Sequence, residues 1–229
     1  MPASSYSYFF SRIVGWVRCH GEIECDGCVY ADQKRENEGK LQHRCPFYRK
    51  ALPKTDEEND EQVMKRIEVN DPAAMRYMGT NRYDEGDYKS AFEYWTRAAA
   101  LGGVEAHHQL SILYQEGQGV EKDEKRAVHH TEQAAIGGHP MARYNLGCFE
   151  GQRGQHDRAT KHWIVAAKLG FDKSLECVMD RYKAGLIGLI SKEDLASALR
   201  GHQAAIDATK SLQRDEAEAA VYYNNYKRK

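Results

Sequence analysis

A repeating spacing constrains this chain more than any other feature of its sequence. Four small residues follow one another at intervals of 32, 36 and 32 residues, namely Ala74, Ala106, Ala142 and Ser174. After each of the first three comes a break marked by glycine and then a second alanine, at Ala91, Ala127 and Ala159. Self-similarity at a period of about 20–50 residues is typical of stacked supersecondary units, none of which buries its apolar face alone.

The half of each unit that follows its second alanine has the pattern of an amphipathic helix. An aromatic residue or threonine stands four positions on, paired alanines seven and eight positions on, and a glycine eleven positions on. The sets are Trp95, Thr131 and Trp163; Ala98-Ala99, Ala134-Ala135 and Ala166-Ala167; and Gly102, Gly138 and Gly170. Spacings of four and seven share one helix face, and glycine suits a left-handed helix end. The pattern predicts antiparallel helix pairs.

The middle break is longer than the other two. Gly86 and Gly154 each precede the next alanine by 5 residues, whereas Gly117 precedes Ala127 by 10. We interpret residues 118–122 as a surface insertion whose deletion the fold should tolerate, because loop entropy varies slowly with length.

A fourth, eroded unit follows the third. Its second helix is predicted to open at the capping box Ser191 to Asp194, with Ser197 at the alanine position and Ala204-Ala205 as the pair. The position of the terminal glycine is taken by Ala208, as expected for an end unit on which nothing stacks.

Composition excludes several classes of function. The net charge is −1, which argues against a basic nucleic-acid-binding face. No apolar run approaches the ~20 residues that a transmembrane helix needs, so we expect no membrane partner. No phosphate loop, nucleophile elbow or dinucleotide fingerprint occurs, so we expect no enzyme activity. Because the six cysteines do not form a dense framework, we expect an intracellular protein, cytoplasmic or nuclear.

The second unit carries a recognisable motif. The stretch EAHHQLSILYQEGQGVEKDEKRAVHHTEQAAIGGHPMARYNLG, from Glu105 to Gly147, resembles the Sel-1-like repeat, a relative of the tetratricopeptide repeat. Two positions depart from the family pattern, since Ser111 replaces a glycine and Thr131 replaces the aromatic residue. The resemblance implies an all-α fold, a right-handed solenoid of antiparallel helix pairs. The expected domains are an N-terminal tail with a small irregular Cys-rich segment, a linker or capping helix, the solenoid and a C-terminal extension, at 1–54, 55–69, 70–208 and 209–229.

The stretches CHGEIECDGC (Cys19 to Cys28) and HRCPFYRKALPKT (His43 to Thr55) resemble the C-terminal half of a RING finger. Fingers of this kind are joined to Sel-1-like repeats in proteins found notably in diatoms. The match is degenerate, because Tyr48 stands at the last cysteine position, Glu22 at another ligand position, and residues 1–18 contain no cysteine.

A tetrahedral zinc site needs four ligands at once. We therefore expect at most one Zn²⁺, held by Cys25, Cys28 and Cys45 with His20 as the fourth ligand, although Cys19 or His43 could take its place. The alternative is a collapsed segment of reduced cysteines without metal.

Two histidine doublets stand out elsewhere, His107-His108 and His129-His130. Neighbours on a helix diverge by about 100°, so neither doublet chelates by itself, but one histidine from each could meet across a helix pair. We favour solvated or groove-lining histidines over metal ligands, which normally come in sets of three or four.

The function that these patterns favour is a monomeric, non-enzymatic adaptor that binds a peptide or another protein in the groove of the solenoid. The groove residues are expected two positions before and after the core residues Met78, Leu110 and Leu146. They are Arg76, Thr80, His108, Ile112, Tyr144 and Cys148. The alternative function is a component of a RING-type E3 ubiquitin ligase, which requires an intact zinc finger.

Overall fold

The computed structural model describes residues 16–19, 22–25, 56–185 and 190–209. The chain divides into two compact units, which are described separately: residues 1–69 with 210–229, and residues 70–209.

The first unit contains a strand pair and a helix. Strands β1 (Trp16–Cys19) and β2 (Glu22–Cys25) are antiparallel, with Trp16 opposite Cys25 and Cys19 opposite Glu22. Polar and apolar residues alternate along β2, a pattern that is typical of a strand. Eight residues of the segment expected to be irregular are thus paired, while the remainder of that segment lies outside the described residues. Helix α3 spans Asp56–Glu68.

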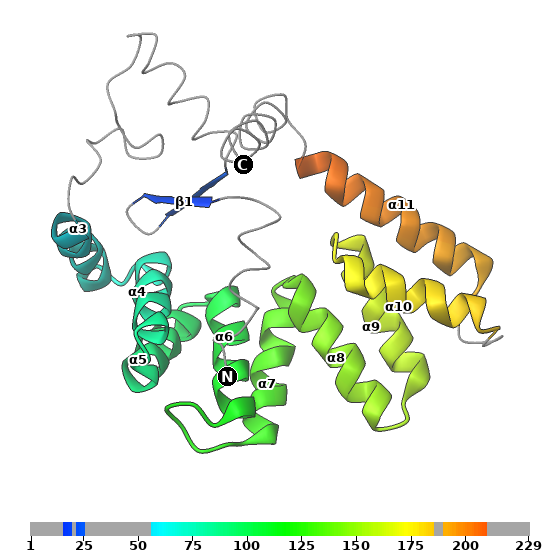
Figure 1. The fold of residues 1–229 in the computed structure, drawn as a ribbon, viewed down its shortest axis with the longest axis horizontal. Coiled ribbons are helices and arrows are strands. Elements are labelled where there is room, and N and C mark those ends of the chain that lie inside the picture. The colour runs from blue at the N-terminus through cyan, green and yellow to red at the C-terminus, as the bar shows by residue number, and fades with distance from the viewer. Residues whose placement is uncertain (1–15, 20–21, 26–55, 186–189, 210–229) are drawn as a thin grey trace, which may run out of the picture. The chain divides into compact units, whose positions relative to one another are not determined.

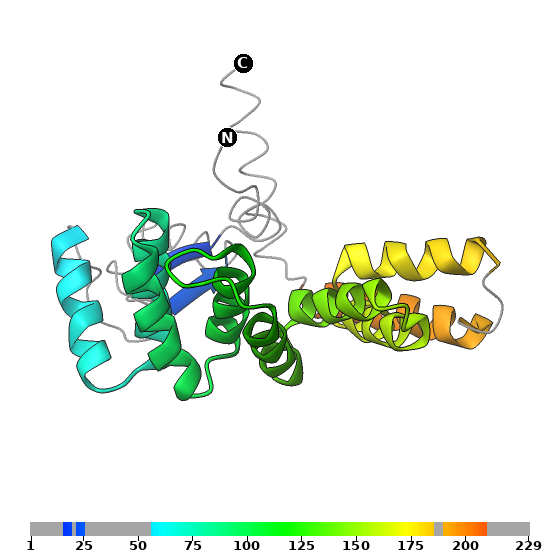
Figure 2. The same ribbon diagram turned by 90° about the horizontal axis from the view of Figure 1, so that it is seen from below.

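The second unit is a succession of helices, as the sequence predicts. Their bounds are α4 (Pro72–Asp84), α5 (Tyr88–Ala100), α6 (Val104–Glu116), α7 (Glu124–Ile136), α8 (Pro140–Gln152), α9 (His156–Lys168), α10 (Asp172–Lys183) and α11 (Lys192–Thr209). Helices α4 and α5, α6 and α7, and α8 and α9 pack as pairs, and α5 contacts α6 as α7 contacts α8. Figure 1 shows neighbouring helices side by side with reversed direction, and Figure 2 shows them from below. The fold of this unit is the all-α helix-pair solenoid expected from the period.

The repeated small residues form the core of this unit. At most about 1 % of the surface is exposed at Ala74, Ala106, Ala142, Ser174, Ala91, Ala127 and Ala159. Gly102, Gly138 and Gly170, just beyond the second helices, have φ of 84°, 89° and 88°, the left-handed conformation that a Cβ would strain. The register of the first three units is therefore confirmed.

Several of the helices begin where a side chain satisfies free N–H groups of the first turn. The carboxylates of Asp71, Asp87 and Asp123 accept hydrogen bonds from backbone amides at the starts of α4, α5 and α7. At α8 a histidine does the same, since His139 Nδ1 accepts from the Ala142 N–H at 3.1 Å. His139 Nε2 lies 3.0 Å from Glu105 Oε2, so this cap also joins the second repeat to the third.

Glycine and tryptophan occupy coupled positions in the first and third repeats. A Cβ added to Gly79 would lie 2.5 Å from Trp95 Cδ1, and one added to Gly147 would lie 2.4 Å from Trp163 Nε1. The indole N–H groups donate to the carbonyls of Arg76 and Tyr144, both at 3.3 Å.

In the second repeat the same two positions hold Ser111 and Thr131. With threonine in place of the indole there is room for a serine side chain, and Ser111 Oγ donates to the His108 carbonyl at 2.7 Å. The carbonyls of Arg76, His108 and Tyr144 stand at equivalent positions, so each repeat satisfies the same acceptor. The two departures from the family pattern are a single coupled exchange.

The fourth unit differs from its predicted register. Ala198 is fully buried, whereas Ser197 is half-buried and Ala204 is exposed, so the prediction is wrong by one residue. Alanines lie on several faces of α11, and their spacing alone did not identify the face that packs inward. One turn after Ala198, the buried His202 places Nε2 2.8 Å from Asp172 Oδ1. The capping box is confirmed, because the Asp194 N–H donates to Ser191 Oγ and the Ser191 N–H to Asp194 Oδ2, both at 3.0 Å.

The insertion at residues 118–122 is docked against the preceding repeat. The Tyr83 hydroxyl donates to Gln118 Oε1 at 3.1 Å. Gly119 has φ 69°, and a Cβ there would lie 2.6 Å from the Tyr88 carbonyl. Only a residue without a side chain permits this approach, so the loop is part of the packing between α4–α5 and α6–α7.

Candidate binding surface on the first helices and a pocket at the long loop

The six predicted groove residues lie at equivalent positions on α4, α6 and α8, and five of them are half-buried. Those five are Arg76, Thr80, Ile112, Tyr144 and Cys148. The exception is His108, which is only 4 % exposed. Its ring stacks on that of His139 with centroids 4.2 Å apart. His108 therefore packs beneath the predicted groove surface and does not line it.

Burial of His108 has an electrostatic consequence. Burial, followed by the proximity of His139, lowers the pKa of His108 to about 4, and Glu105 opposes this shift. Its Nδ1 atom has no hydrogen-bond partner among the described residues. At neutral pH this ring is therefore uncharged and acts as a packing group.

A phenol and two thiols come together where the third repeat meets the fourth unit. Tyr144 and Cys148 come from α8 and Cys177 from α10, and all three are half-buried. Burial raises the pKa of Tyr144, and hydrogen bonding to Cys148 and Cys177 raises it further. Burial and the neighbouring Cys148 likewise raise the pKa of Cys177. The Tyr144 ring also contacts Phe171, with centroids 5.2 Å apart, which gives this end of the surface a neutral, aromatic character.

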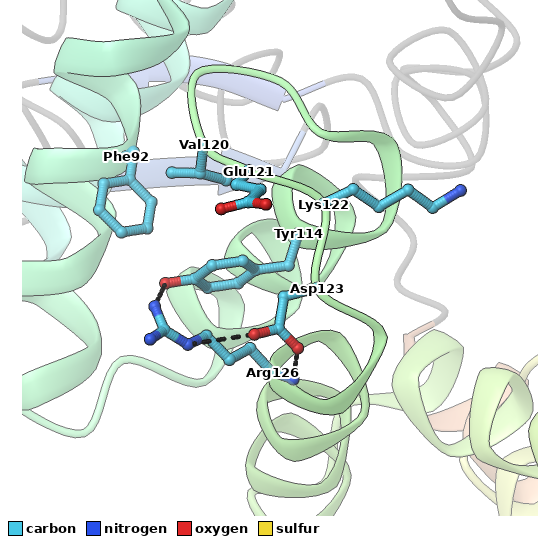
Figure 3. Close-up of a pocket in the computed structure, with 7 residues that line it drawn as sticks. All are labelled: Phe92, Tyr114, Val120, Glu121, Lys122, Asp123 and Arg126. Atoms are coloured by element: carbon cyan, nitrogen blue, oxygen red, sulfur yellow. Dashed lines mark hydrogen bonds and ion pairs between the residues drawn. The ribbon is translucent and has the colours of Figure 1, made fainter.

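A pocket of about 440 Å³ lies beside the long loop. It is lined by Phe92 of α5, Tyr114 of α6, Val120, Glu121, Lys122 and Asp123 of the loop, and Arg126 of α7. Figure 3 shows the phenol of Tyr114 directed towards the guanidinium of Arg126, with Phe92 facing it across the hollow.

Tyr114 organises the pocket. Arg126 donates to the Tyr114 hydroxyl at 3.3 Å and pairs with Asp123 at 3.4 Å. Phe92 meets the Tyr114 ring edge-on, with centroids 5.7 Å apart. The site thus combines apolar rings with charges of both signs. The sequence reasoning missed it, although the insertion that distinguishes the second repeat was a signal for it.

The histidine doublets do meet across a helix pair. His107 Nδ1 of α6 and His130 Nδ1 of α7 are 3.0 Å apart. Within the described part of the chain, no three or more His, Cys, Asp or Glu residues gather in a manner that could hold a metal ion. Of the predicted zinc ligands, Cys25 ends β2, and Cys28, Cys45 and His20 lie outside the described residues, so that site stays a prediction.

No helix in the described residues is long and apolar enough to cross a membrane.

Comparison with known proteins identifies the repeats. The Sel1 repeat model matches residues 72–103, 104–139 and 140–171. These three spans have the lengths 32, 36 and 32 that the sequence spacing predicts.

Two curated proteins are similar over part of the chain. The chitin synthase regulator SKT5 of Saccharomyces cerevisiae is 28 % identical over 91 residues, which are 38 % of this chain and 13 % of that protein. The DAP3-binding cell death enhancer 1 of Rattus norvegicus is 32 % identical over 79 residues, 34 % of this chain and 15 % of that protein. The match spans less than a sixth of either relative.

Two solved structures share the fold. A Sel1 repeat protein from Oxalobacter formigenes is 26 % identical, with a TM-score of 0.57 and coverage of 80 % of both chains. A protective antigen of uropathogenic Escherichia coli that displays an SLR fold is also 26 % identical, with a TM-score of 0.51 over 66 % of this chain and 33 % of that one. The helix pairs, the coupled glycine and tryptophan positions and these matches together show that residues 72–171 are three consecutive Sel1 repeats.

Proposed function

We propose that this protein is a non-enzymatic adaptor that binds a peptide or a segment of another protein along the first helices of its Sel1 repeats. The observation that carries the proposal is the equivalence of Arg76, Thr80, Ile112, Tyr144 and Cys148. They stand at repeating positions on three first helices, and all are half-buried, so they remain partly accessible to a ligand. Stacked helix pairs form extended binding surfaces of this kind.

The chemistry of these side chains favours a ligand with both apolar and polar groups. Ile112 and the Tyr144 ring offer apolar contact, while Arg76 and Thr80 offer polar groups at the other end. Of the two similar curated proteins, one is named as a regulator of chitin synthase and the other as DAP3-binding. Those names support a role in binding or regulation, and they do not identify the partner of this chain.

Selection of peptides from a random displayed library against the full chain tests the proposal. The affinity of the selected peptides is then measured by fluorescence anisotropy. Ile112→Glu and Tyr144→Ala should each weaken binding by about tenfold or more, as central contacts do. Ile136→Glu is the control, because Ile136 lies at the end of α7, a second helix, and is 74 % exposed. Peptides that are insensitive to both groove changes would contradict the assignment of the surface.

For the N-terminal segment we propose at most one Zn²⁺, bound by Cys25, Cys28, Cys45 and His20, with Cys19 or His43 as substitutes for His20. The degenerate ligand pattern in the sequence supports this stoichiometry, because a structural site is filled only when four ligands converge. Elemental analysis of the purified full chain should give one zinc or none. Two equivalents would favour the alternative function, a RING-type ubiquitin ligase component.

A further inference from the structure

A pair of imidazoles links the two helices of the second repeat. His107 Nδ1 and His130 Nδ1 are 3.0 Å apart, and both side chains are half-buried. Because two imidazole lone pairs repel at this distance, one of the two nitrogens must carry a proton and donate it to the other. A metal ion could take the place of this proton if the donor ring shifts to the tautomer protonated at Nε2, because both Nδ1 lone pairs are then available to the ion.

The separation of the two nitrogens matches the geometry of certain ions. With metal–nitrogen bonds of about 2.05 Å, nitrogens 3.0 Å apart subtend an angle of about 94° at the metal. That angle suits adjacent positions in octahedral or square-planar coordination, the geometries of Ni²⁺ and Cu²⁺. Tetrahedral Zn²⁺ would require the nitrogens to separate to about 3.3 Å.

A neighbouring ring holds His130 in place. The Tyr114 ring stacks on His130 with an interplanar angle of 6° and centroids 5.6 Å apart. This contact restricts the orientation of one of the two imidazoles before a metal ion binds.

The contact between the two rings also fits the form of imidazole that binds metals, which is the neutral one. Whichever ring accepts the hydrogen bond at 3.0 Å has a free lone pair and is therefore neutral. Arg126, which donates to the Tyr114 hydroxyl, is a cation close to the pair. Its pairing with Asp123 at 3.4 Å offsets its charge.

We propose that His107 and His130 form a binding site for one divalent transition-metal ion of the Ni²⁺ and Cu²⁺ class, bound through both Nδ1 atoms with water in its other positions. Two protein ligands give a weaker site than the three or four of a structural metal centre. A bound ion would join α6 to α7 beside Tyr114, which also lines the loop pocket. The site is independent of the adaptor function.

Calorimetric titration of the full chain with NiCl₂ at pH 7 tests the site. The wild-type protein should bind one more equivalent of Ni²⁺ than His107→Gln or His130→Gln, whatever the N-terminal cysteines bind. If a variant still binds Ni²⁺ at this site, its affinity for the ion should be lower by about tenfold or more. Even the replacement of residues that only contact a metal ligand weakens metal binding 10–100-fold. His156→Gln is the matched control, because His156 lies at the exposed start of α9, and it should bind like the wild type.

A second measurement uses the unmodified sequence and does not depend on how the variants fold. Diethyl pyrocarbonate acylates neutral imidazoles, and mass spectrometry locates the modified residues. Ni²⁺ should protect His107 and His130 while leaving His156 reactive. Unchanged stoichiometry and affinity in both glutamine variants, or no protection of the pair in the wild type, would overturn the proposal and leave the contact as a hydrogen bond alone.

Discussion

Gly147→Ser should destabilise this protein when Trp163 is present and stabilise it slightly when Trp163 is replaced by threonine. In the native structure a Cβ at position 147 would lie 2.4 Å from Trp163 Nε1 and 2.7 Å from Cδ1. Non-bonded heavy atoms settle at about 3.5–4.0 Å, so the indole or α8 would have to move by about an ångström. Overpacking of this kind costs about 1–3 kcal/mol in the free energy of unfolding.

The sign should change in the Trp163→Thr background because the obstacle is gone. Serine has a higher helix propensity than glycine by about 0.5 kcal/mol. Its hydroxyl can also donate to the Tyr144 carbonyl, which the indole no longer serves, as Ser111 does for the His108 carbonyl at 2.7 Å. Trp163→Thr by itself should cost about 3–5 kcal/mol, as large-to-small core changes do.

Urea denaturation followed by circular dichroism at 222 nm gives the free energy of unfolding of the wild type, both single variants and the double variant. The coupling energy between the two sites should be about 2 kcal/mol, within the range for residues in direct contact. Gly151→Ser is the control, because a Cβ there meets nothing nearer than 3.8 Å. An equal cost of Gly147→Ser in both backgrounds would refute the reasoning.

Three further changes test other parts of the structure. Ala135→Leu should lower the free energy of unfolding by about 1–3 kcal/mol through overpacking, because Ala135 is buried in the core of the second repeat. A thermal midpoint equal to that of the wild type would contradict the register of the repeats. Deletion of residues 118–122 should lower the free energy of unfolding by about 1 kcal/mol, because the hydrogen bond from Tyr83 to Gln118 is lost, and it should abolish the pocket. Equal or higher stability in urea would show that the loop contacts do not stabilise the fold. Burial first, then neighbouring charges, lowers the pKa of His108 and of His130 to about 4. In the unfolded chain these groups bind protons below about pH 6.5, so stability should fall from pH 7 towards pH 4, and His108→Gln should make the dependence of the urea midpoint on pH shallower.

The amino-acid sequence by itself determined the repeat, its period and the helix pairs. This was possible because each determinant is local or periodic. The buried alanines recur with helical spacing, and a left-handed glycine follows the second helix of each of the first three units. An aspartate or a capping box begins α4, α5, α7 and α11. The candidate groove follows from the same period, which places Thr80, Ile112 and Cys148 at one position of successive first helices. The period did not reveal that His108, another of the six predicted groove residues, is buried.

Only the tertiary structure decided which residues act together across helices. Ser111 and Thr131 are two unrelated departures in the sequence, and they become one exchange when the contacts between Gly147 and Trp163 are seen. The register predicted for the fourth repeat was wrong by one residue. Several faces of α11 carry alanine, and only tertiary packing determines which of these faces is buried. His107 and His130 are 23 positions apart, yet their Nδ1 atoms are 3.0 Å apart. Such pairings depend on the relative rotation of two packed helices, which side-chain packing sets and a single-helix pattern does not contain.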